Sequence, residues 1–184
     1  MKELLAKLDE LIKKFRPDYY EKLNSPLTES EIRRLETKFN VLLPRDLKEL
    51  YLWKNGQAGD CYESFVNNSE FTPLQNVLEM AGEFNSMIGK DFTIENWWNE
   101  SWLPIFHNGR GSYLCYDLDG TFTNLEGQIL EFWKADNDRN VISNSLKSFL
   151  KQLVYFYEDF DPDDFDEAFI VENVPGYPKR FYVK

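Results

Sequence analysis

The first candidate for chemistry is His107, the only histidine in the 184-residue sequence. Any serine–histidine, cysteine–histidine or two-histidine metal mechanism would have to use this side chain. The residues that follow it, Asn108-Gly109-Arg110-Gly111, have the composition of a turn. The two cysteines, Cys61 and Cys115, are far apart and lack the C-x-x-C spacing of zinc sites. We therefore predict that His107 is an ordinary turn residue, and we expect no catalytic residue, metal site or cofactor.

The segment from Cys115 to Glu126 partly matches the calcium loop of an EF-hand. Asp117, Asp119, Gly120 and Glu126 fall at positions 3, 5, 6 and 12 of that motif. The first ligand, normally an aspartate, is replaced by Cys115, and both flanks have strand-like composition where the motif requires helices. A chance match is therefore the favoured interpretation.

Two other chemical signals are weak. Gly109-x-Gly111 lacks the remaining glycine of a dinucleotide fingerprint, and it joins two predicted strands where phosphate binding requires a helix N-terminus. The 32 acidic residues give many accidental carboxylate pairs, and nothing singles out one pair for glycosidic or proton-transfer chemistry. A solvated acidic face is the simpler interpretation.

An acidic cluster near the C-terminus combines charge with aromatic side chains. Seven acids and two phenylalanines fall within ten residues: Glu158, Asp159, Phe160, Asp161, Asp163, Asp164, Phe165, Asp166 and Glu167. One interpretation is a solubilising, partly disordered tail. The other is an interaction patch, in which the phenylalanines anchor a partner and the acids attract its positive charge. The sequence leaves both interpretations open.

The net charge of −11 is unevenly distributed. Residues 1–60 hold 12 basic and 11 acidic side chains, whereas residues 61–184 hold 9 and 21. Such a field repels nucleic-acid phosphates and anionic lipid, and it favours a basic protein partner. We therefore expect a protein partner, and neither nucleic acid nor a membrane. The mixed charges of residues 1–14 do not form a signal peptide, and no apolar run approaches the ~20 residues of a membrane span. The expected location is the cytoplasm.

Helical signals dominate the first half of the chain. Leu4, Leu8, Leu11 and Phe15 recur at helical spacing, which predicts an amphipathic helix ending near Pro17. A capping box at Thr28 and Glu31 predicts the start of a second helix, Pro44 the first residue of a third, and Asn55-Gly56 its end. Thr72-Pro73 predicts the start of a further helix, which is followed by a polar, irregular stretch over residues 89–101.

Strand signals follow in residues 102–133. Apolar and aromatic runs separated by glycine-rich turns predict three strands, at about residues 102–106, 112–118 and 127–133. Asn144-Ser145 then caps a last helix, whose buried stripe is predicted to run from Leu146 to Tyr157. The fold class expected is α+β, with a mixed, mainly antiparallel sheet, helices packed around it, and a single domain.

The chain resembles the SUKH superfamily, and within it the Smi/Knr-type cell-wall assembly regulator proteins. The resemblance covers roughly residues 1–157, and three pieces carry it: Thr28-x-x-Glu31-Ile32-x-x-Leu35-Glu36 with Leu43-Pro44-x-Asp46-Leu47 and Asn55-Gly56-Gln57; Trp102-Leu103-Pro104-Ile105 with Gly111-x-Tyr113-Leu114-Cys115-Tyr116-Asp117-Leu118; and Gly127-Gln128-Ile129. The sequence departs from the family pattern after Leu118, where Asp119-Gly120 stands in place of Pro-Gly and a longer insert precedes Gly127.

The resemblance implies an α+β fold and a non-enzymatic role. Bacterial members are commonly immunity proteins that neutralise toxins, many of them nucleases, and fungal members are regulatory proteins of cell-wall synthesis. A shared fold does not decide between these roles. The acidic charge favours an immunity protein that binds a basic toxin domain; a regulatory scaffold is the alternative, and an enzyme is a third.

Residues 1–157 are expected to form the SUKH domain, and residues 158–184 an acidic C-terminal tail that packs on it or extends from it. The expected contacts with a partner are Trp97 and Trp98, taken as exposed, together with the acidic cluster Glu158, Asp159, Phe160, Asp161, Asp163, Asp164, Phe165, Asp166 and Glu167. Asp117 and Gln128 join this set from the family-like strand region, with a structural role as the alternative.

Overall fold

A computed structural model describes residues 1–159 and 174–184. Its first two helices are α1 (Lys2–Phe15) and α2 (Pro17–Glu21). The predicted amphipathic helix is confirmed, but its buried face is centred on Leu5, Leu8, Leu11 and Ile12, and Leu4 is only half-buried. The sequence did not predict α2, whose first residue is a proline that begins a helix at little cost.

The helix pair α3 (Glu29–Phe39) and α4 (Arg45–Trp53) begins as the capping signals predict. The Glu31 amide donates to Thr28 Oγ1 at 3.2 Å, and the Thr28 amide donates to the Glu31 carboxylate at 2.7 Å. Asn40 ends α3 in the left-handed conformation, with φ of 50°. Pro44, predicted as the first residue of α4, is its N-cap, so the helix begins one residue later than predicted, at Arg45.

Five strands form one sheet in the order β1 (Glu70–Phe71), β2 (Trp102–His107), β3 (Ser112–Asp117), β4 (Gln128–Trp133) and β5 (Val141–Ser143). Each neighbouring pair is antiparallel, which confirms the mainly antiparallel α+β prediction. The three longer strands lie where the sequence places them. The short β5 was missed, because three residues carry too little alternation to be recognised without their partner strand.

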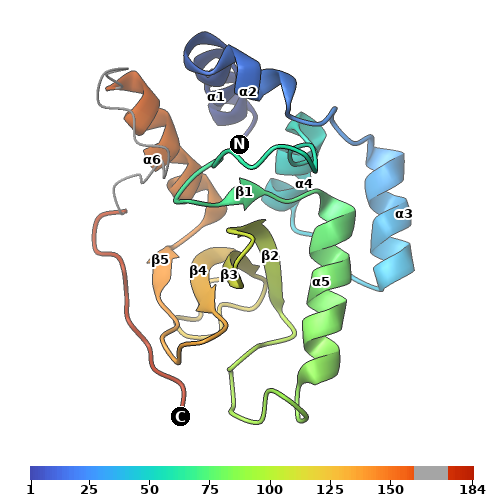
Figure 1. The fold of residues 1–184 in the computed structure, drawn as a ribbon, viewed down its shortest axis with the longest axis vertical. Helices are drawn as coiled ribbons and strands as arrows, with labels where there is room; N and C mark the ends of the chain where they lie inside the picture. Colours follow the sequence, from blue (N-terminus) through green and yellow to red (C-terminus); the bar gives the residue numbers. More distant parts are fainter. Residues whose placement is uncertain (160–173) are drawn as a thin grey trace.

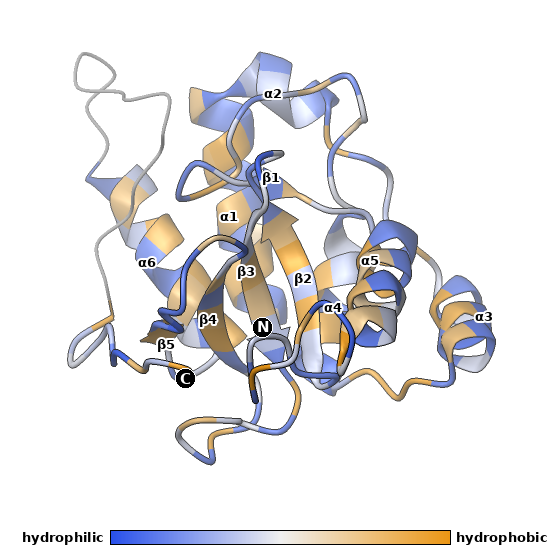
Figure 2. Ribbon diagram, turned by 60° about the horizontal axis from the view of Figure 1, so that its bottom comes forward, coloured by the Kyte–Doolittle hydropathy of each residue, from blue (hydrophilic) through white to orange (hydrophobic). Residues whose placement is uncertain are grey.

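The two faces of the sheet are covered by different helices (Figure 1). On one face, Phe84 of α5 (Leu74–Met87) lies with its ring centre 5.3 Å from that of Tyr113. On the other face, Phe106 lies 6.0 Å from Phe149 of α6 (Leu146–Glu158). Figure 2 shows hydrophobic colour concentrated on the central strands and on the inward sides of the helices. The core therefore lies on both sides of β2, β3 and β4.

The C-terminal segment from Val174 to Lys184 runs along the outer edge of β5. Val141 and Lys179 exchange two main-chain hydrogen bonds, at 2.9 and 2.8 Å, and Arg139 donates its amide to the carbonyl of Phe181 at 2.8 Å. Val183 is buried at the end of this segment. We refer to residues 174–184 as the strap. Within the described ranges, no helix has both the length and the apolar character needed to cross a membrane.

Candidate functional site

The structure does not gather the residues that the sequence marks as partner contacts. Glu158 and Asp159 lie at the end of α6, whereas Trp97 and Trp98 belong to the loop of residues 88–101 between α5 and β2. Figure 1 shows that these two regions lie at opposite ends of the molecule. The remaining members of the predicted acidic cluster, residues 160–167, lie outside the described residues.

Trp98 is not exposed, so that part of the prediction is wrong. Its side chain is 2% exposed, and its ring centre lies 4.7 Å from Phe84 and 5.0 Å from Phe132. Its indole N–H donates to Asn85 Oδ1 at 2.8 Å. The irregular loop folds over the sheet, and burying a tryptophan with a satisfied N–H stabilises that arrangement. Trp97, its neighbour, is half-buried.

Asp117 and Gln128 are brought together, but in the interior. They are register partners at the facing ends of β3 and β4, both are fully buried, and Gln128 Nε2 donates to Asp117 Oδ2 at 2.7 Å. The Asp117 carboxylate also accepts the amides of Asp119, Gly120 and Thr121, at 3.2, 3.0 and 2.6 Å. It therefore holds the loop of residues 118–127 in one conformation. We call this pair the loop clamp.

The loop clamp extends to the end of the loop 88–101. Ser101 Oγ donates to Asp117 Oδ1 at 3.2 Å, and the Leu118 amide donates to the Ser101 carbonyl at 2.9 Å. Thr121 Oγ1 donates to Asp117 and accepts the indole N–H of Trp102 at 2.9 Å. These bonds occupy both carboxylate oxygens with donors from the chain itself. In the described part of the chain, no group of three or more His, Cys, Asp or Glu side chains is placed to hold a metal ion.

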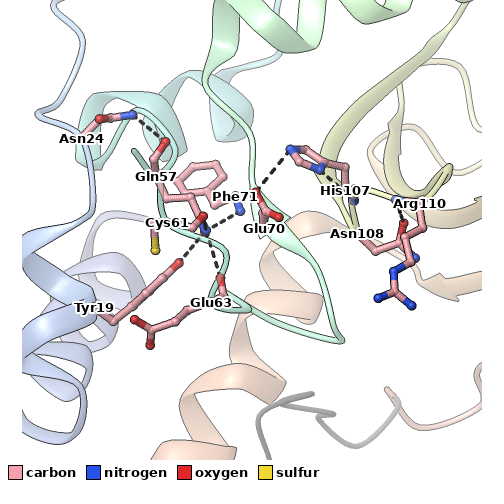
Figure 3. A network of polar contacts seen from close by, with 11 residues as sticks. Tyr19, Asn24, Gln57, Cys61, Glu63, Glu70, Phe71, His107, Asn108 and Arg110 are labelled. Carbon is pink, nitrogen blue, oxygen red and sulfur yellow. Dashed lines mark hydrogen bonds and ion pairs between the residues drawn. The ribbon is translucent and has the colours of Figure 1, made fainter. Parts of the chain in front are cut away.

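A second polar network lies beside β1 (Figure 3). Gln57 is buried at its centre, where its Oε1 accepts the hydroxyl of Tyr19 at 2.8 Å and the amide of Phe71 at 2.9 Å. Its Nε2 donates to the carbonyls of Cys61 and Glu63, at 2.8 and 2.9 Å. Gln57 thereby fixes α2, β1 and the intervening loop to one another. All of its side-chain hydrogen-bonding capacity serves the fold.

The two residues before Gln57 complete this junction. Asn55 Oδ1 accepts the amide of Leu74 at 3.0 Å, which caps the first turn of α5 from outside the helix. Gly56 has φ of 72°, and a Cβ there would lie 2.4 Å from the backbone nitrogen of Pro73. The sequence predicts that Asn55-Gly56 ends α4, but the helix ends at Trp53 with Lys54 as its C-cap, and Asn55-Gly56 instead positions the start of α5.

A polar groove of about 730 Å³ opens above this junction. Arg110 of the β2–β3 hairpin and Glu70 of β1 supply its charged groups, and His107 and amide side chains supply much of the rest. His107 Nε2 lies 3.8 Å from the Glu70 carboxylate, while His107 Nδ1 accepts the amide of Gly109 at 3.1 Å. His107 is the last residue of β2 and is paired with Glu70 and Tyr113, so the turn begins one residue later than predicted, at Asn108.

Among the residues that the structure describes, the groove contains no arrangement typical of nucleophilic catalysis. Cys61 belongs to the same network, but burial raises the pKa of its thiol above the ordinary value, which disfavours the reactive thiolate. His107 donates to no hydroxyl or thiol among its contacts in the described residues, and the Gly109 amide occupies its Nδ1. The arrangement suits recognition by hydrogen bonds and charge, with the side chains that build it held rigidly from below.

A third feature, absent from the sequence prediction, is the buried Arg139. Its guanidinium donates to the carbonyl of Trp97 at 2.7 and 3.1 Å, and to the carbonyls of Asp136 and Asp138 at 2.7 and 2.6 Å. Its centre also lies 4.8 Å from that of the Phe132 ring. Burial lowers the pKa of Arg139 to about 10. Nothing in the local sequence marks this role, because each contact except those to Asp136 and Asp138 is made across the fold.

The comparisons agree with the sequence resemblance. The model of the SMI1 / KNR4 family (SUKH-1) matches residues 26–152, which include the junction at Gln57, the loop clamp and Arg139. No curated protein matches the chain. The match extends over more than half of the sequence and over the whole sheet, so the chain belongs to the SMI1 / KNR4 family (SUKH-1).

Proposed function

We propose that this chain is a non-enzymatic, cytoplasmic immunity protein that binds a basic toxin domain and blocks its active site. Membership of the SMI1 / KNR4 family supports a binding role, since immunity and regulatory proteins are the roles this resemblance implies. The net charge of −11 is the observation that carries the choice of partner. A nuclease toxin must be basic where it holds nucleic acid, so an acidic inhibitor gains both association rate and orientation.

The interior of the chain supports binding over catalysis. The polar side chains that stand out, Gln57, Asp117 and Gln128, are buried and fully engaged with the chain. Their contacts fix the loops that surround them and leave no free acid, base or nucleophile at their centres. Rigid loops on a stable sheet favour tight binding, because little conformational freedom is lost when the partner docks.

Co-expression tests this function. The toxin-like product of the gene next to this one is expressed with and without the chain, and growth and complex formation are measured. We expect the chain to restore growth and to co-purify with the toxin. Absence of both rescue and complex would overturn the proposal. Rescue without a complex would also overturn it, since inhibition would then not require binding.

A regulatory role is the second candidate, because the resemblance to this family also implies regulatory proteins of cell-wall synthesis. In that case the tagged chain would retain signalling or envelope-synthesis enzymes of its own cell. Equal affinity for such an enzyme and for the toxin would support this role in place of immunity.

A further inference from the structure

We propose that the loops of residues 88–101 and 118–127, called here the paired loops, form the docking surface for the basic partner. This inference rests on the proposed function, and it names the face that performs it. Sequence reasoning placed the partner at the acidic cluster after α6 and at two tryptophans. The structure instead points to exposed side chains on these two loops. Buried contacts of Trp97, Trp98 and Asp117 hold the loops in place.

The two loops are adjacent and mutually fixed. The Leu118 amide bonds to the Ser101 carbonyl at 2.9 Å, so the first residue of one loop is tied to the last residue of the other. Trp102, which directly follows the first loop, donates to Thr121 of the second at 2.9 Å, and its ring centre lies 6.0 Å from that of Phe122. The paired loops therefore form one continuous surface.

The first loop is long and irregular, yet it is anchored along its length. Phe92 and Trp98 are buried beneath it, and Arg139 holds the carbonyl of Trp97 with two hydrogen bonds. Loops of this length without secondary structure are uncommon in compact domains, and they are usually functional. Burying an arginine whose hydrogen bonds go to uncharged carbonyls is costly. A loop that has to keep one conformation to bind a partner explains why the fold tolerates this cost.

The outward side chains of the paired loops fit a basic partner. Asp91, Glu95 and Glu100 on the first loop, and Asp119 and Glu126 on the second, are all exposed. Lys90 is the single cation in the two loops, so their sequences carry a net charge of −4. None of the five acids forms an ion pair within the described ranges, and their charge is therefore available to a partner.

Apolar side chains lie among these acids. Ile88, Ile94 and Leu125 are 43%, 36% and 41% exposed, and no other segment of comparable length in the described chain exposes two large aliphatic residues. Partly exposed apolar groups surrounded by charge are typical of interface anchors, since they gain most when a partner removes them from water. The combination of a charged surface and apolar anchors favours a protein partner over a free ion.

The strap places positive charge on one side of the paired loops. Phe181 stacks on Phe122 with ring centres 4.9 Å apart, so the strap borders the second loop. Its residues Lys179, Arg180 and Lys184 are exposed cations. A basic partner is expected to approach from the side away from the strap. The polar groove beside β1 is a weaker candidate for the same partner, because exposed Arg110 lines it.

Charge variants test the proposal with the purified toxin from the neighbouring gene as the probe. The loop variant carries Asp91→Asn, Glu95→Gln, Asp119→Asn and Glu126→Gln. The control variant carries Glu3→Gln, Glu10→Gln, Asp18→Asn and Glu21→Gln, which remove the same total charge from exposed positions on α1 and α2. At low ionic strength we expect the loop variant to associate at least ~10-fold more slowly, and the control variant less than ~3-fold more slowly. Equal slowing of both variants would overturn the proposal.

Apolar substitutions provide a second, independent test. Ile94→Ser and Leu125→Ser together should raise the dissociation rate of the toxin complex about 10-fold or more. Leu42→Ser is the matched control, since Leu42 is 81% exposed in the connection between α3 and α4, and it should leave the rate unchanged. Faster dissociation of the Leu42→Ser variant, or unchanged dissociation of the Ile94→Ser, Leu125→Ser double variant, would contradict the assignment.

Hydrogen exchange of the wild-type complex separates this inference from the proposed function without any substitution. Slower amide exchange in both paired loops on toxin binding is the expected result. A complex that protects residues 57–76 and 107–112 instead would overturn the docking surface and leave the immunity function intact. Failure of the wild-type chain to bind or neutralise the toxin would overturn the function itself.

Discussion

Arg139 and Trp97 are joined by two hydrogen bonds from the guanidinium to one carbonyl oxygen, at 2.7 and 3.1 Å, with the guanidinium centre 5.0 Å from the indole centre. This contact links the turn before β5 to the loop before β2. Both segments are irregular, and a single side chain from one of them supplies hydrogen bonds that the backbone of each would otherwise lack.

Replacement of Arg139 should loosen the loop 88–101 selectively. Arg139→Met keeps much of the apolar volume but leaves the carbonyls of Trp97, Asp136 and Asp138 without these donors, so we expect the free energy of unfolding to fall by about 2–4 kcal/mol. Urea denaturation measures that loss, and hydrogen exchange should accelerate in residues 88–101 more than in α1. Arg110→Met, at an exposed position, is the control and should change neither quantity.

The loop clamp predicts a reversed pH dependence in one variant. In Gln128→Glu, a carboxylate replaces the amide that lies 2.7 Å from Asp117 Oδ2, and two buried carboxylates cannot both be charged at low cost. The pKa of the pair in the folded state then rises above the value in the unfolded chain, about 4. The contribution of this carboxyl pair to the free energy of unfolding is therefore complete below that unfolded value, and it is lost as pH rises through the folded pKa. Denaturation midpoints should be higher near pH 5 than near pH 7.5, whereas equal midpoints would contradict a close carboxylate pair.

The Glu36 carboxylate should contribute to acid sensitivity with the opposite sign. Burial raises its pKa, but the hydrogen bond from Lys48 and the amide of Leu43, each at 2.8 Å, outweigh burial and lower the pKa below its usual value of 4.5. Its contribution is complete above the unfolded pKa and is lost as pH falls through the lowered folded value. Glu36→Gln should reduce the difference in stability between about pH 6 and pH 3. Glu29→Gln, on the exposed side of α3, is the control and should leave that difference nearly unchanged.

Two glycines of one segment should respond oppositely to alanine. Gly56 has φ of 72°, and its added Cβ would lie 2.4 Å from the backbone of Pro73, so Gly56→Ala should lower the free energy of unfolding by about 2–4 kcal/mol. Gly59 has no neighbouring atom within 4 Å of such a Cβ, so Gly59→Ala should be neutral or slightly stabilising. Thermal denaturation of the two variants measures the contrast. Similar midpoints would show that the junction before α5 tolerates displacement.

Local signals in the sequence predict the elements that depend on local contacts. The capping box at Thr28 and Glu31 and the cap at Ser145 both lie where predicted, because an N-cap involves residues within one turn of the helix. The short elements α2 and β5 were missed. Each is too short to show a period, and β5 exists through its pairing with β4.

The candidate site was harder to predict, since it depends on which surfaces the fold buries. Trp98 lies in a stretch whose composition is typical of an exposed loop, and only its contacts with Phe84 and Phe132 show that its side chain is buried. Asp117 and Gln128 were found through the family-like motif, but the motif does not distinguish a contact residue from a buried support. Arg139 gave no signal, because its partner carbonyl at Trp97 is 42 residues away.

The strap has a consequence for how this protein behaves in concentrated solution. Strand β5 lies at one edge of the sheet. An uncovered edge strand exposes unpaired amides and carbonyls, which can pair with a strand of another chain. The two hydrogen bonds between Val141 and Lys179 pair such groups within the same molecule. A shortened chain that ends before Val174 would leave these groups unpaired, so the strap protects the molecule against edge-to-edge association.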